Sequence, residues 1–355
     1  MTKRALVAMS GGVDSAVAAL LIKEAGFDTA GMTMKLWSDY ERVTDVYSGI
    51  STPDIEDAKK IADALGIPHH TLSLGDTFRE CVINSFIHAY KSGATPNPCV
   101  ECNKKIKFGK MLDVALDMGF DYIATGHYAQ IEKTSSGRYI IKRAKDADKD
   151  QSYVLWSLPQ STLAHTLLPL GAYKKSEIRE IAAAHNFSNA HKSDSQDICF
   201  IPDGDYVGFI RSTTGETSPC GNFIDINGNI LGQHQGVINY TIGQRKGLGI
   251  ALGKPMFVKE KDVIHNTVTL CDNNELFSTR LYASSANFIA VDSIDSPMKV
   301  TAKIRYKHDA APATVEQTDD GRFVLEFDTP QRAIAKGQSV VLYSDDIVVG
   351  GGIIE

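Results

Sequence analysis

The sequence predicts an α/β fold: a doubly wound parallel sheet, followed by small β-rich domains of which the last is a β-barrel. The first observation is an apolar run over 5–9 that passes through a glycine turn into an amphipathic segment. The second is that short apolar runs alternate with helical patterns as far as about residue 130, as in parallel sheets. The third is a change beyond about residue 200, where short alternating runs separated by Gly, Asn and Asp favour antiparallel strands.

Local sequence patterns predict each helix and strand of the first part of the chain. The helix after the first strand has apolar side chains at helical spacing, namely Val13, Val17, Leu20 and Leu21. Thr52, Pro53 and an acidic first turn start a second helix, which Gly66 ends. We further predict strands over 31–34, 69–72 and 122–125 and helices over about 77–91 and 105–118. Ligands of such a sheet bind at the carboxyl ends of its strands.

The rest of the chain predicts a hairpin, one more helix and then β structure. The hairpin spans 131–143 around a Ser-Ser-Gly turn, and the helix spans 173–187. Strand-like runs follow at 256–258, 268–270, 300–306, 323–327 and 339–343. We therefore expect a nucleotide-binding domain over 1–200, a central β-rich domain over 201–280 and a C-terminal β-barrel over 281–355.

Composition excludes some classes of protein. The chain has 355 residues and a net charge of −6, so nucleic acid would have to bind to local basic patches such as 104–110 or 142–149. No apolar stretch is long enough to span a membrane, and the first strand begins too early for a signal or transit peptide. We therefore expect a cytoplasmic protein with no membrane partner.

Residues 10–15, Ser-Gly-Gly-Val-Asp-Ser, follow the first strand directly and have the composition of a phosphate loop. Backbone N–H groups at a helix N-terminus bind phosphate, and glycine lets the backbone approach an anion closely. The hydroxyl groups of Ser10 and Ser15 can add donors, and Asp14 can help to hold Mg²⁺ on the phosphates. The loop lacks the Gly-Lys-Ser/Thr end of a Walker loop and the dinucleotide pattern G-x-G-x-x-G.

Six cysteines are scattered through the chain, at 81, 99, 102, 199, 220 and 271, which is unlike a secreted disulfide scaffold. In a reducing compartment, Cys99-x-x-Cys102 favours catalysis, redox chemistry or metal binding over a structural disulfide. Cys102 is expected near a helix N-terminus, with Lys104 and Lys105 close by, and both features lower a thiol pKa. The alternative is a pair of buried, inert cysteines. Cys199 lies in a short apolar run and, taken alone, is typical of a core residue.

Six motifs in a fixed order give the chain a family resemblance. They are Ser10–Ser15, Pro96–Pro98 with Cys102–Asn103, Ala124–Tyr128, Lys149–Tyr153, Ser195–Phe200 and Gly243–Gly249. The loop resembles that of the ATP-pyrophosphatases, the PP-loop group with an adenine nucleotide α-hydrolase-like fold. The whole set resembles the tRNA-specific 2-thiouridylases, which thiolate the wobble uridine of certain tRNAs.

This resemblance implies an activity: the uracil C2 oxygen is adenylated by ATP, and sulfur carried as a persulfide replaces it, with release of AMP and pyrophosphate. It implies that Cys199 carries the persulfide and that Cys102 is the partner thiol, often called the nucleophile. Cys102 then either attacks the bridging sulfur, which releases the product and leaves a Cys102–Cys199 disulfide, or first liberates hydrosulfide, which attacks C2. The implied partners are tRNA and a sulfur-donor protein, either a persulfide relay or a cysteine desulfurase.

The resemblance also implies roles for other positions. The residues expected to bind ATP are Ala8, Met9, Ser10, Gly11, Gly12, Val13, Asp14, Ser15, Met34 and Gly126. Those expected to face the target base are Asn97, Pro98 and Cys99. Those expected to contact tRNA are His127, Lys149, Asp150, Gln151, Arg305, Tyr306 and Gln338.

Cys99 departs from the family pattern, because many members carry Asp there, suggested as a general acid or base. A thiol with a suitable pKa can relay a proton in its place. Alternatively, Cys99, Cys102 and Cys199 can hold a [4Fe–4S] cluster, as in some related RNA-thiolating enzymes. Structural zinc is weakly indicated, because no second ligand pair is apparent. Two rival functions remain: a PP-loop ligase acting on a small metabolite or making lysidine in tRNA, and a tRNA-binding module without catalysis.

Overall fold

The first sheet is parallel throughout, as the sequence predicts. The structure is a computed structural model that describes residues 2–36, 52–187, 189–190 and 198–355. In this part of the chain the first sheet has the strand order β3-β2-β1-β4-β7. The strands are β1 (Arg4–Ala8), β2 (Asp28–Lys35), β3 (His69–Ser73), β4 (Tyr122–Ala124) and β7 (Thr166–Leu167). Each pair of neighbours is parallel, so the carboxyl ends of the strands share one edge.

Helices cover both faces of this sheet. One face packs against α1 (Val13–Glu24), α2 (Thr52–Leu65) and α8 (Lys175–Ala184), whose buried side chains include Val17, Ala58 and Ile178. The other face packs against helices that contribute Phe86, Ile106 and Met111. Alternate residues of β1 point to opposite faces, because successive side chains of a strand alternate, so Leu6 belongs to one core and Val7 to the other.

The predicted helix over 105–118 begins earlier than its apolar pattern indicates. It starts as α5 (Pro98–Glu101), continues as the π-helix η3 (Cys102–Lys110) and ends as α6 (Met111–Asp117). Asn97 caps it, because its side-chain oxygen accepts the Cys99 N–H at 3.1 Å, and Pro98 occupies the first helical position. The helix predicted over 77–91 likewise comprises α3 (Gly75–Phe78), the π-helix η2 (Arg79–Ile83) and α4 (Asn84–Lys91).

The C-terminal strands form a closed antiparallel barrel, as predicted. Its strands are β12 (Phe277–Phe288), β13 (Met298–Lys303), β14 (Ala311–Gln317), β15 (Phe323–Arg332), β16 (Ser339–Ser344) and β17 (Ile347–Ile354). The order β12-β15-β14-β13-β16-β17 closes because β12 also pairs with β17. The hairpin of β5 (Gln130–Lys133) and β6 (Tyr139–Lys142) joins this sheet through the pairing of Lys142 with Ile347. The barrel is therefore attached to the first domain.

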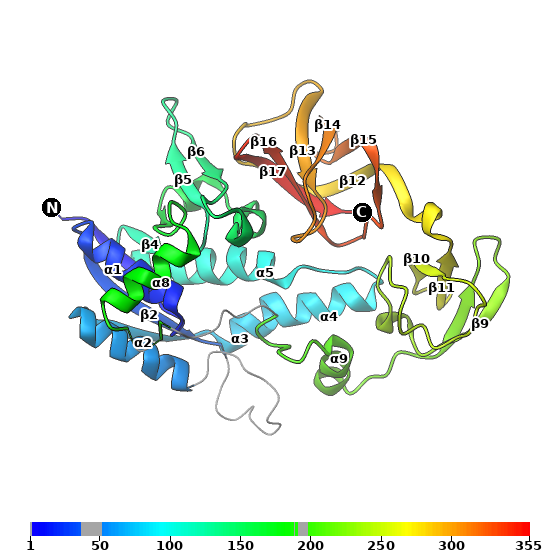
Figure 1. Ribbon diagram of the computed structural model, residues 1–355, viewed down its shortest axis with the longest axis horizontal. Helices are drawn as coiled ribbons and strands as arrows, with labels where there is room; N and C mark the ends of the chain where they lie inside the picture. Colours follow the sequence, from blue (N-terminus) through cyan, green and yellow to red (C-terminus); the bar gives the residue numbers. More distant parts are fainter. Residues whose placement is uncertain (1, 37–51, 188, 191–197) are drawn as a thin grey trace.

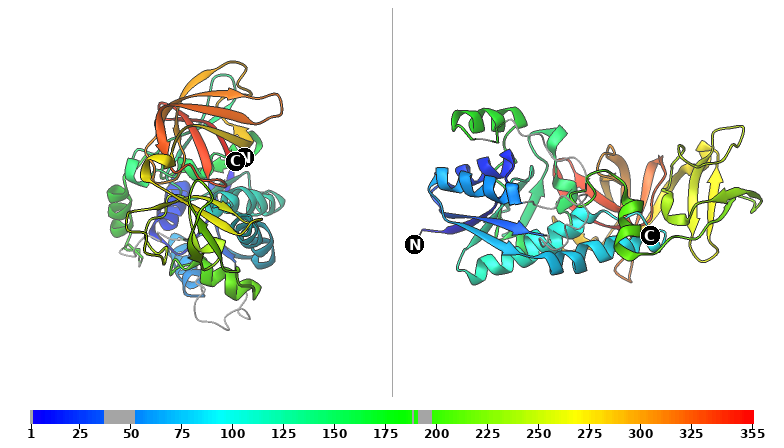
Figure 2. Two further views of the ribbon diagram at one scale, coloured as in Figure 1. Left: turned by 90° about the vertical axis from the view of Figure 1, so that its right-hand side faces the viewer. Right: turned by 90° about the horizontal axis from the view of Figure 1, so that it is seen from below.

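A separate four-stranded sheet lies at the end of the molecule opposite the parallel sheet (Figures 1 and 2). It has the order β10-β11-β8-β9, with β8 (Gly221–Ile224), β9 (Ile230–His234), β10 (Phe257–Asp262) and β11 (Thr267–Cys271). The short helix α9 (Tyr206–Thr214) leads into it. The barrel lies between the two other units in the view from below (Figure 2). None of the helices in the described ranges is long and apolar enough to cross a membrane.

Candidate active site

The loop of residues 10–15 joins β1 to α1 and is held in shape by its own serines. The Ser15 hydroxyl accepts the Ser10 N–H at 3.1 Å and donates to the Gly12 carbonyl oxygen at 2.9 Å. Gly11 has φ +74°, and a Cβ at this position would lie 2.6 Å from the Asp54 carbonyl oxygen. Only glycine fits here without displacing α2. The first N–H groups of α1 lack acceptors within the helix, which makes this loop a suitable cradle for phosphate.

Asp14, in the first turn of α1, forms an ion pair that the sequence did not reveal. Lys175, at the start of α8, places Nζ 2.7 Å from Oδ1 and 2.8 Å from Oδ2 of Asp14. The Tyr128 hydroxyl donates to the same Oδ1 at 2.6 Å. Each carboxylate oxygen that accepts one hydrogen bond still has a free lone pair, so the expected role of Asp14 as a magnesium ligand stays a prediction.

The other residues expected to bind ATP lie at the same edge of the sheet. Met34 is buried near the carboxyl end of β2, and Gly126 follows β4. A Cβ on Gly126 would lie 2.9 Å from the backbone carbonyl carbon of Asp14, so this glycine packs directly against the loop. The Asn189 side chain adds a hydrogen bond to the Gly11 carbonyl oxygen at 3.0 Å. This is the edge at which ligands of parallel sheets bind, although the role of these residues in ATP binding remains a prediction.

Three cysteines from distant parts of the chain form a cluster, which we call the thiol cluster: Cys99, Cys102 and Cys199. Cys99 and Cys102 lie on α5 and η3, and Cys199 is close enough for both to act on its thiol electrostatically. The Cys102 side chain is buried, whereas Cys99 and Cys199 are exposed on one side and surrounded by protein on the others. All three are free thiols. Residues 195–197 of the motif that precedes Cys199 lie outside the described residues.

The expectation that Cys102 has a lowered pKa is wrong. Burial raises the pKa of Cys102 to about 11 and that of Cys199 to about 12, and it also raises the pKa of Cys99. The two local features that the sequence suggested are arranged differently in the structure. The helix begins four residues before Cys102, at Pro98, and Lys105 pairs with Glu101 at 2.9 Å. The cation that lowers the pKa of Cys102 is Lys107.

The thiol cluster is not arranged as a metal site. Over the ranges that the structure describes, no three His, Cys, Asp or Glu side chains are grouped so that they could hold a metal ion. The three thiols therefore do not fit the expected [4Fe–4S] cluster, which needs its cysteine ligands around one centre.

The barrel closes over the segment that precedes the thiol cluster. Gln338 donates from Nε2 to the Thr95 carbonyl oxygen at 2.8 Å, and the Thr95 N–H donates to the Lys336 carbonyl oxygen at 2.8 Å. Tyr306 lies just after β13, where burial, Asp150 and the nearby Cys99 raise its pKa. Its hydroxyl donates to the Asp150 carbonyl oxygen at 3.1 Å. The barrel thus places Gln338 and Tyr306, which are expected to contact tRNA, beside the segment of residues 95–99, part of which is expected to face the target base.

Other residues expected to contact tRNA have partners inside the protein. The Asp150 carboxylate accepts the Ala144 N–H and the Ser152 hydroxyl, and the Gln151 side chain accepts the Tyr128 N–H at 2.9 Å. The guanidinium group of Arg305 donates to the Arg332 carbonyl oxygen at 2.6 Å. Lys149 ends the short helix η4 (Ala147–Lys149). These contacts shape the loops on which the residues lie, and direct contact of these residues with tRNA remains a prediction.

The His127 side chain, which is expected to contact tRNA, is only 8% exposed. Its Nδ1 lies 2.6 Å from the Thr125 hydroxyl, and its Nε2 lies 3.4 Å from Lys107 Nζ. The ring of Phe108 packs against it. Burial and the nearby Lys107 hold the pKa of His127 well below its usual value. His127 is thus a neutral interior residue in this structure, and its expected contact with tRNA stays a prediction.

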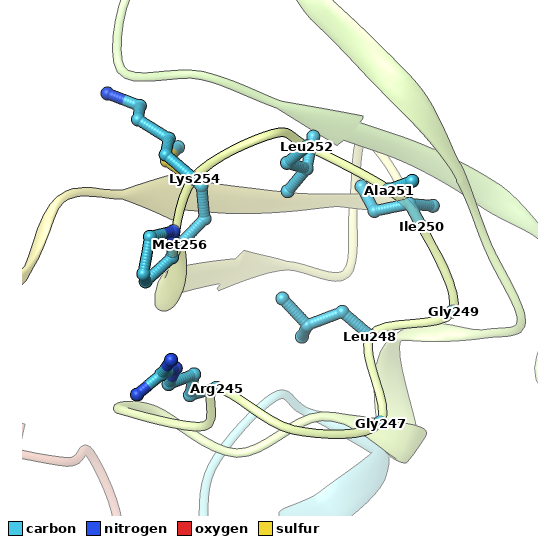
Figure 3. A pocket seen from close by; sticks show the side chains of 10 residues that line it. Arg245, Gly247, Leu248, Gly249, Ile250, Ala251, Leu252, Lys254 and Met256 are labelled. Atoms are coloured by element: carbon cyan, nitrogen blue, oxygen red, sulfur yellow. The ribbon is translucent and has the colours of Figure 1, made fainter.

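A pocket of about 370 Å³ lies away from the thiol cluster, in the four-stranded unit. Figure 3 shows its lining, which comes from the loop between Arg245 and Met256 and includes part of the Gly243–Gly249 motif. Lys254 at its rim pairs with Asp272 at 2.8 Å. The thiol cluster and the phosphate loop contribute no side chain to it.

Comparison with known proteins gives a consistent set of relatives. Residues 3–203 match the family described as "tRNA methyl transferase HUP domain". Residues 208–272 match the "tRNA methyl transferase PRC-barrel domain", and residues 278–354 match the "Aminomethyltransferase beta-barrel domain". The chain is 49% identical to the tRNA-specific 2-thiouridylase MnmA of Clostridioides difficile, covering 100% of this chain and 99% of that protein. It is 47% identical to the tRNA-specific 2-thiouridylase MnmA of Lachnoclostridium phytofermentans, covering 99% of this chain and 99% of that protein. Among solved structures it is similar to a 4-thiouridine synthetase–RNA complex (20% identity, 56% of this chain, 45% of that chain, TM-score 0.34).

Proposed function

Because the chain belongs to the family of tRNA-specific 2-thiouridylases, we propose that it replaces the C2 oxygen of the wobble uridine of tRNA with sulfur, at the expense of ATP. The observation that carries the proposal is a chain of contacts from the phosphate loop to the thiol cluster. Gly126 packs on Asp14 of the loop, the next residue, His127, contacts Lys107, and Lys107 acts on all three thiols. A site for activating an oxygen with ATP therefore adjoins a site that can supply sulfur.

The first step activates the uracil oxygen, which is a poor leaving group. The C2 oxygen attacks the α-phosphorus of ATP, pyrophosphate leaves, and an O-adenylated uridine forms. Backbone N–H groups of residues 10–15 bind the β- and γ-phosphates and stabilise the charge that develops on the departing pyrophosphate. Lys175 assists by neutralising Asp14, which would otherwise repel the phosphates. A magnesium ion bound with ATP would supply further neutralising charge there, and Asp14 would help to hold it.

The second step transfers sulfur. The terminal sulfur of a persulfide on Cys199 attacks C2, and AMP departs with the original oxygen. The Cys102 thiolate then attacks Sγ of Cys199, and the electrons of the broken S–S bond remain on the sulfur attached to C2, which becomes the thiocarbonyl. A Cys102–Cys199 disulfide is left, and an external thiol reductant returns it to two thiols. The persulfide comes from a sulfur-donor protein.

The remaining assignments complete the proposal. Residues 1–200 form the catalytic domain, 201–280 the central domain and 281–355 the barrel domain. Asn97, Pro98 and Cys99 face the target base, and Lys149, Arg305 and Tyr306 contact the tRNA around it. The six free thiols suit a reducing compartment, so the enzyme acts in the cytoplasm. A metabolite ligase on the same loop would have no use for the thiol cluster.

Serine substitutions test the proposal. Cys102→Ser and Cys199→Ser should each abolish 2-thiouridine formation with ATP, tRNA and a persulfide donor, measured by mass spectrometry of nucleosides. Both variants should still release pyrophosphate when tRNA is added, because adenylation does not use a thiol. Cys220→Ser, which changes an exposed cysteine in the central domain, is the matched control and should retain both activities. Full thiolation by either Cys102→Ser or Cys199→Ser would refute the assigned roles.

A further inference from the structure

The π-helix η3 places Lys107 on the same side of the helix as Cys102. The two residues are five positions apart, and in an α-helix such residues point about 140° away from each other. In a π-helix the hydrogen bonds join residues five apart, so the fifth residue returns to nearly the same side. The Met111 N–H donates to the carbonyl oxygen of Ile106, five residues earlier, which is the bond expected of this wider turn. A regular α-helix here would turn Lys107 away from Cys102.

His127 fixes the position of the Lys107 ammonium group. The two nitrogens, Nζ and Nε2, lie 3.4 Å apart. An ammonium group only donates, so Nε2 accepts, and the ring hydrogen is on Nδ1, where it donates to the Thr125 hydroxyl at 2.6 Å. Burial keeps the ring neutral and therefore able to accept. The interior thus provides Lys107 with an uncharged partner that orients its ammonium group without neutralising it.

That positive charge acts on the thiol cluster. Burial raises the pKa of Cys99, Cys102 and Cys199. The charge of Lys107 lowers the pKa of each thiol and so opposes part of that effect. The two neighbouring lysines are placed differently, because Lys104 is exposed and Lys105 pairs with Glu101 at 2.9 Å. The π-helix therefore selects one lysine of a basic segment to face the sulfur atoms.

From this geometry we propose that Lys107 is a positioning residue that stabilises sulfur anions in the thiol cluster, with His127 as its anchor. The inference rests on the sulfur transfer proposed above. Two anions occur in that sequence: the persulfide on Cys199 and the Cys102 thiolate, whose proton leaves to solvent. Burial disfavours both charges, and a fixed cation offsets that cost. The attack of Cys102 on Cys199 is the step that most depends on Lys107.

The test compares Lys107→Met with Lys107→Arg, and uses Lys59→Met as the matched control because Lys59 is an exposed lysine on α2. The first measurement is the rate at which iodoacetamide labels Cys102 at fixed pH, in protein without tRNA or ATP. The second is the ratio of 2-thiouridine formation to tRNA-dependent pyrophosphate release. We expect Lys107→Met to slow the labelling of Cys102 about tenfold, because Lys107 lowers the pKa of that thiol, and to slow thiolation without slowing pyrophosphate release. Lys107→Arg should restore most of both rates.

Each result bears on the inference. Unchanged labelling of Cys102 in Lys107→Met would overturn it, as would a loss of thiolation that Lys107→Arg fails to rescue. A parallel fall in thiolation and pyrophosphate release, with a lower melting temperature, would show a purely structural role and would also overturn it. Failure of the wild-type protein to thiolate tRNA would refute the proposed function instead, while the labelling measurement would still report on Lys107.

Discussion

Lys175 reaches across 161 residues of sequence to place Nζ within 2.7 and 2.8 Å of the two carboxylate oxygens of Asp14. The phosphate loop contains no lysine of its own, and α8 supplies the positive charge from outside it. The Lys175 side chain is only 9% exposed, so this ion pair is largely removed from water. The pair fixes the start of α1 and prevents a bare carboxylate from facing the phosphates of ATP.

Lys175→Met should destabilise the protein and weaken ATP binding. Removing one partner of a buried ion pair costs roughly 3 kcal/mol, because the other charge stays buried without compensation. We expect a loss of about this size, reduced somewhat because Asp14 is 30% exposed, in urea unfolding. Lys174→Met removes an exposed lysine next to it and serves as the control. Equal stability of the two variants would contradict the role given to the ion pair.

Gly126→Ala should impair ATP binding by pushing against the phosphate loop. The added Cβ would lie 2.9 Å from the Asp14 carbonyl carbon and 3.1 Å from its Cβ, so the loop must shift. Calorimetric titration with a non-hydrolysable ATP analogue should show weaker binding, with little change in overall stability. The control is Gly75→Ala, whose added Cβ meets its nearest atom at 3.5 Å. If Gly126→Ala binds the analogue with wild-type affinity, ATP binding does not depend on this edge of the sheet.

His127 should make the stability of the protein sensitive to mild acid. Its pKa in the folded protein is held well below 6.5, so the unfolded chain takes up a proton first as the pH falls. The neutral ring therefore contributes fully to the free energy of unfolding above pH 6.5. This contribution is lost as the pH falls, by about 1.4 kcal/mol for each unit that separates the pKa of His127 in the unfolded chain from that in the folded protein.

His127→Gln keeps an acceptor for Lys107 but does not titrate. Its free energy of unfolding, measured in urea at pH values above and below 6.5, should fall less on acidification than that of the wild type. His88→Gln, which changes an exposed histidine on α4, is the matched control. If His127→Gln loses as much stability in acid as the wild type, the ring is not held neutral by its surroundings.

Gln338→Ala should loosen the segment that precedes the thiol cluster. It removes a hydrogen bond worth about 1 kcal/mol, which Gln338 donates to the Thr95 carbonyl oxygen. This bond is one of those that join the barrel to the segment. We expect kcat/KM for tRNA thiolation to fall about fivefold, the factor that matches this energy. Gln317→Ala removes a similar bond, to the Ile294 N–H, elsewhere on the barrel. An equal fall in kcat/KM for both variants would mean that only barrel stability matters.

Local sequence patterns predicted the parallel sheet, α2 and the barrel, because each depends on apolar periodicity and on caps close in sequence. The helix start at Pro98 was missed even though Asn97 and Pro98 form a recognisable cap, because the apolar pattern becomes regular only after Lys105. The Asp14–Lys175 pair and the joining of β6 to β17 depend on tertiary packing, which no local pattern encodes. The pKa of Cys102 was wrongly expected to be low because burial, which dominates it, is a property of the folded chain.

The most direct test of the account is the stoichiometry of one reaction. Purified protein, ATP, unmodified tRNA and a persulfide donor are mixed, and AMP, pyrophosphate and 2-thiouridine are measured together over time. The account predicts that each thiolated uridine is accompanied by one AMP and one pyrophosphate, with the original C2 oxygen, traced by ¹⁸O, recovered in AMP. Thiolated tRNA formed without AMP, or with the labelled oxygen released into water, would contradict it.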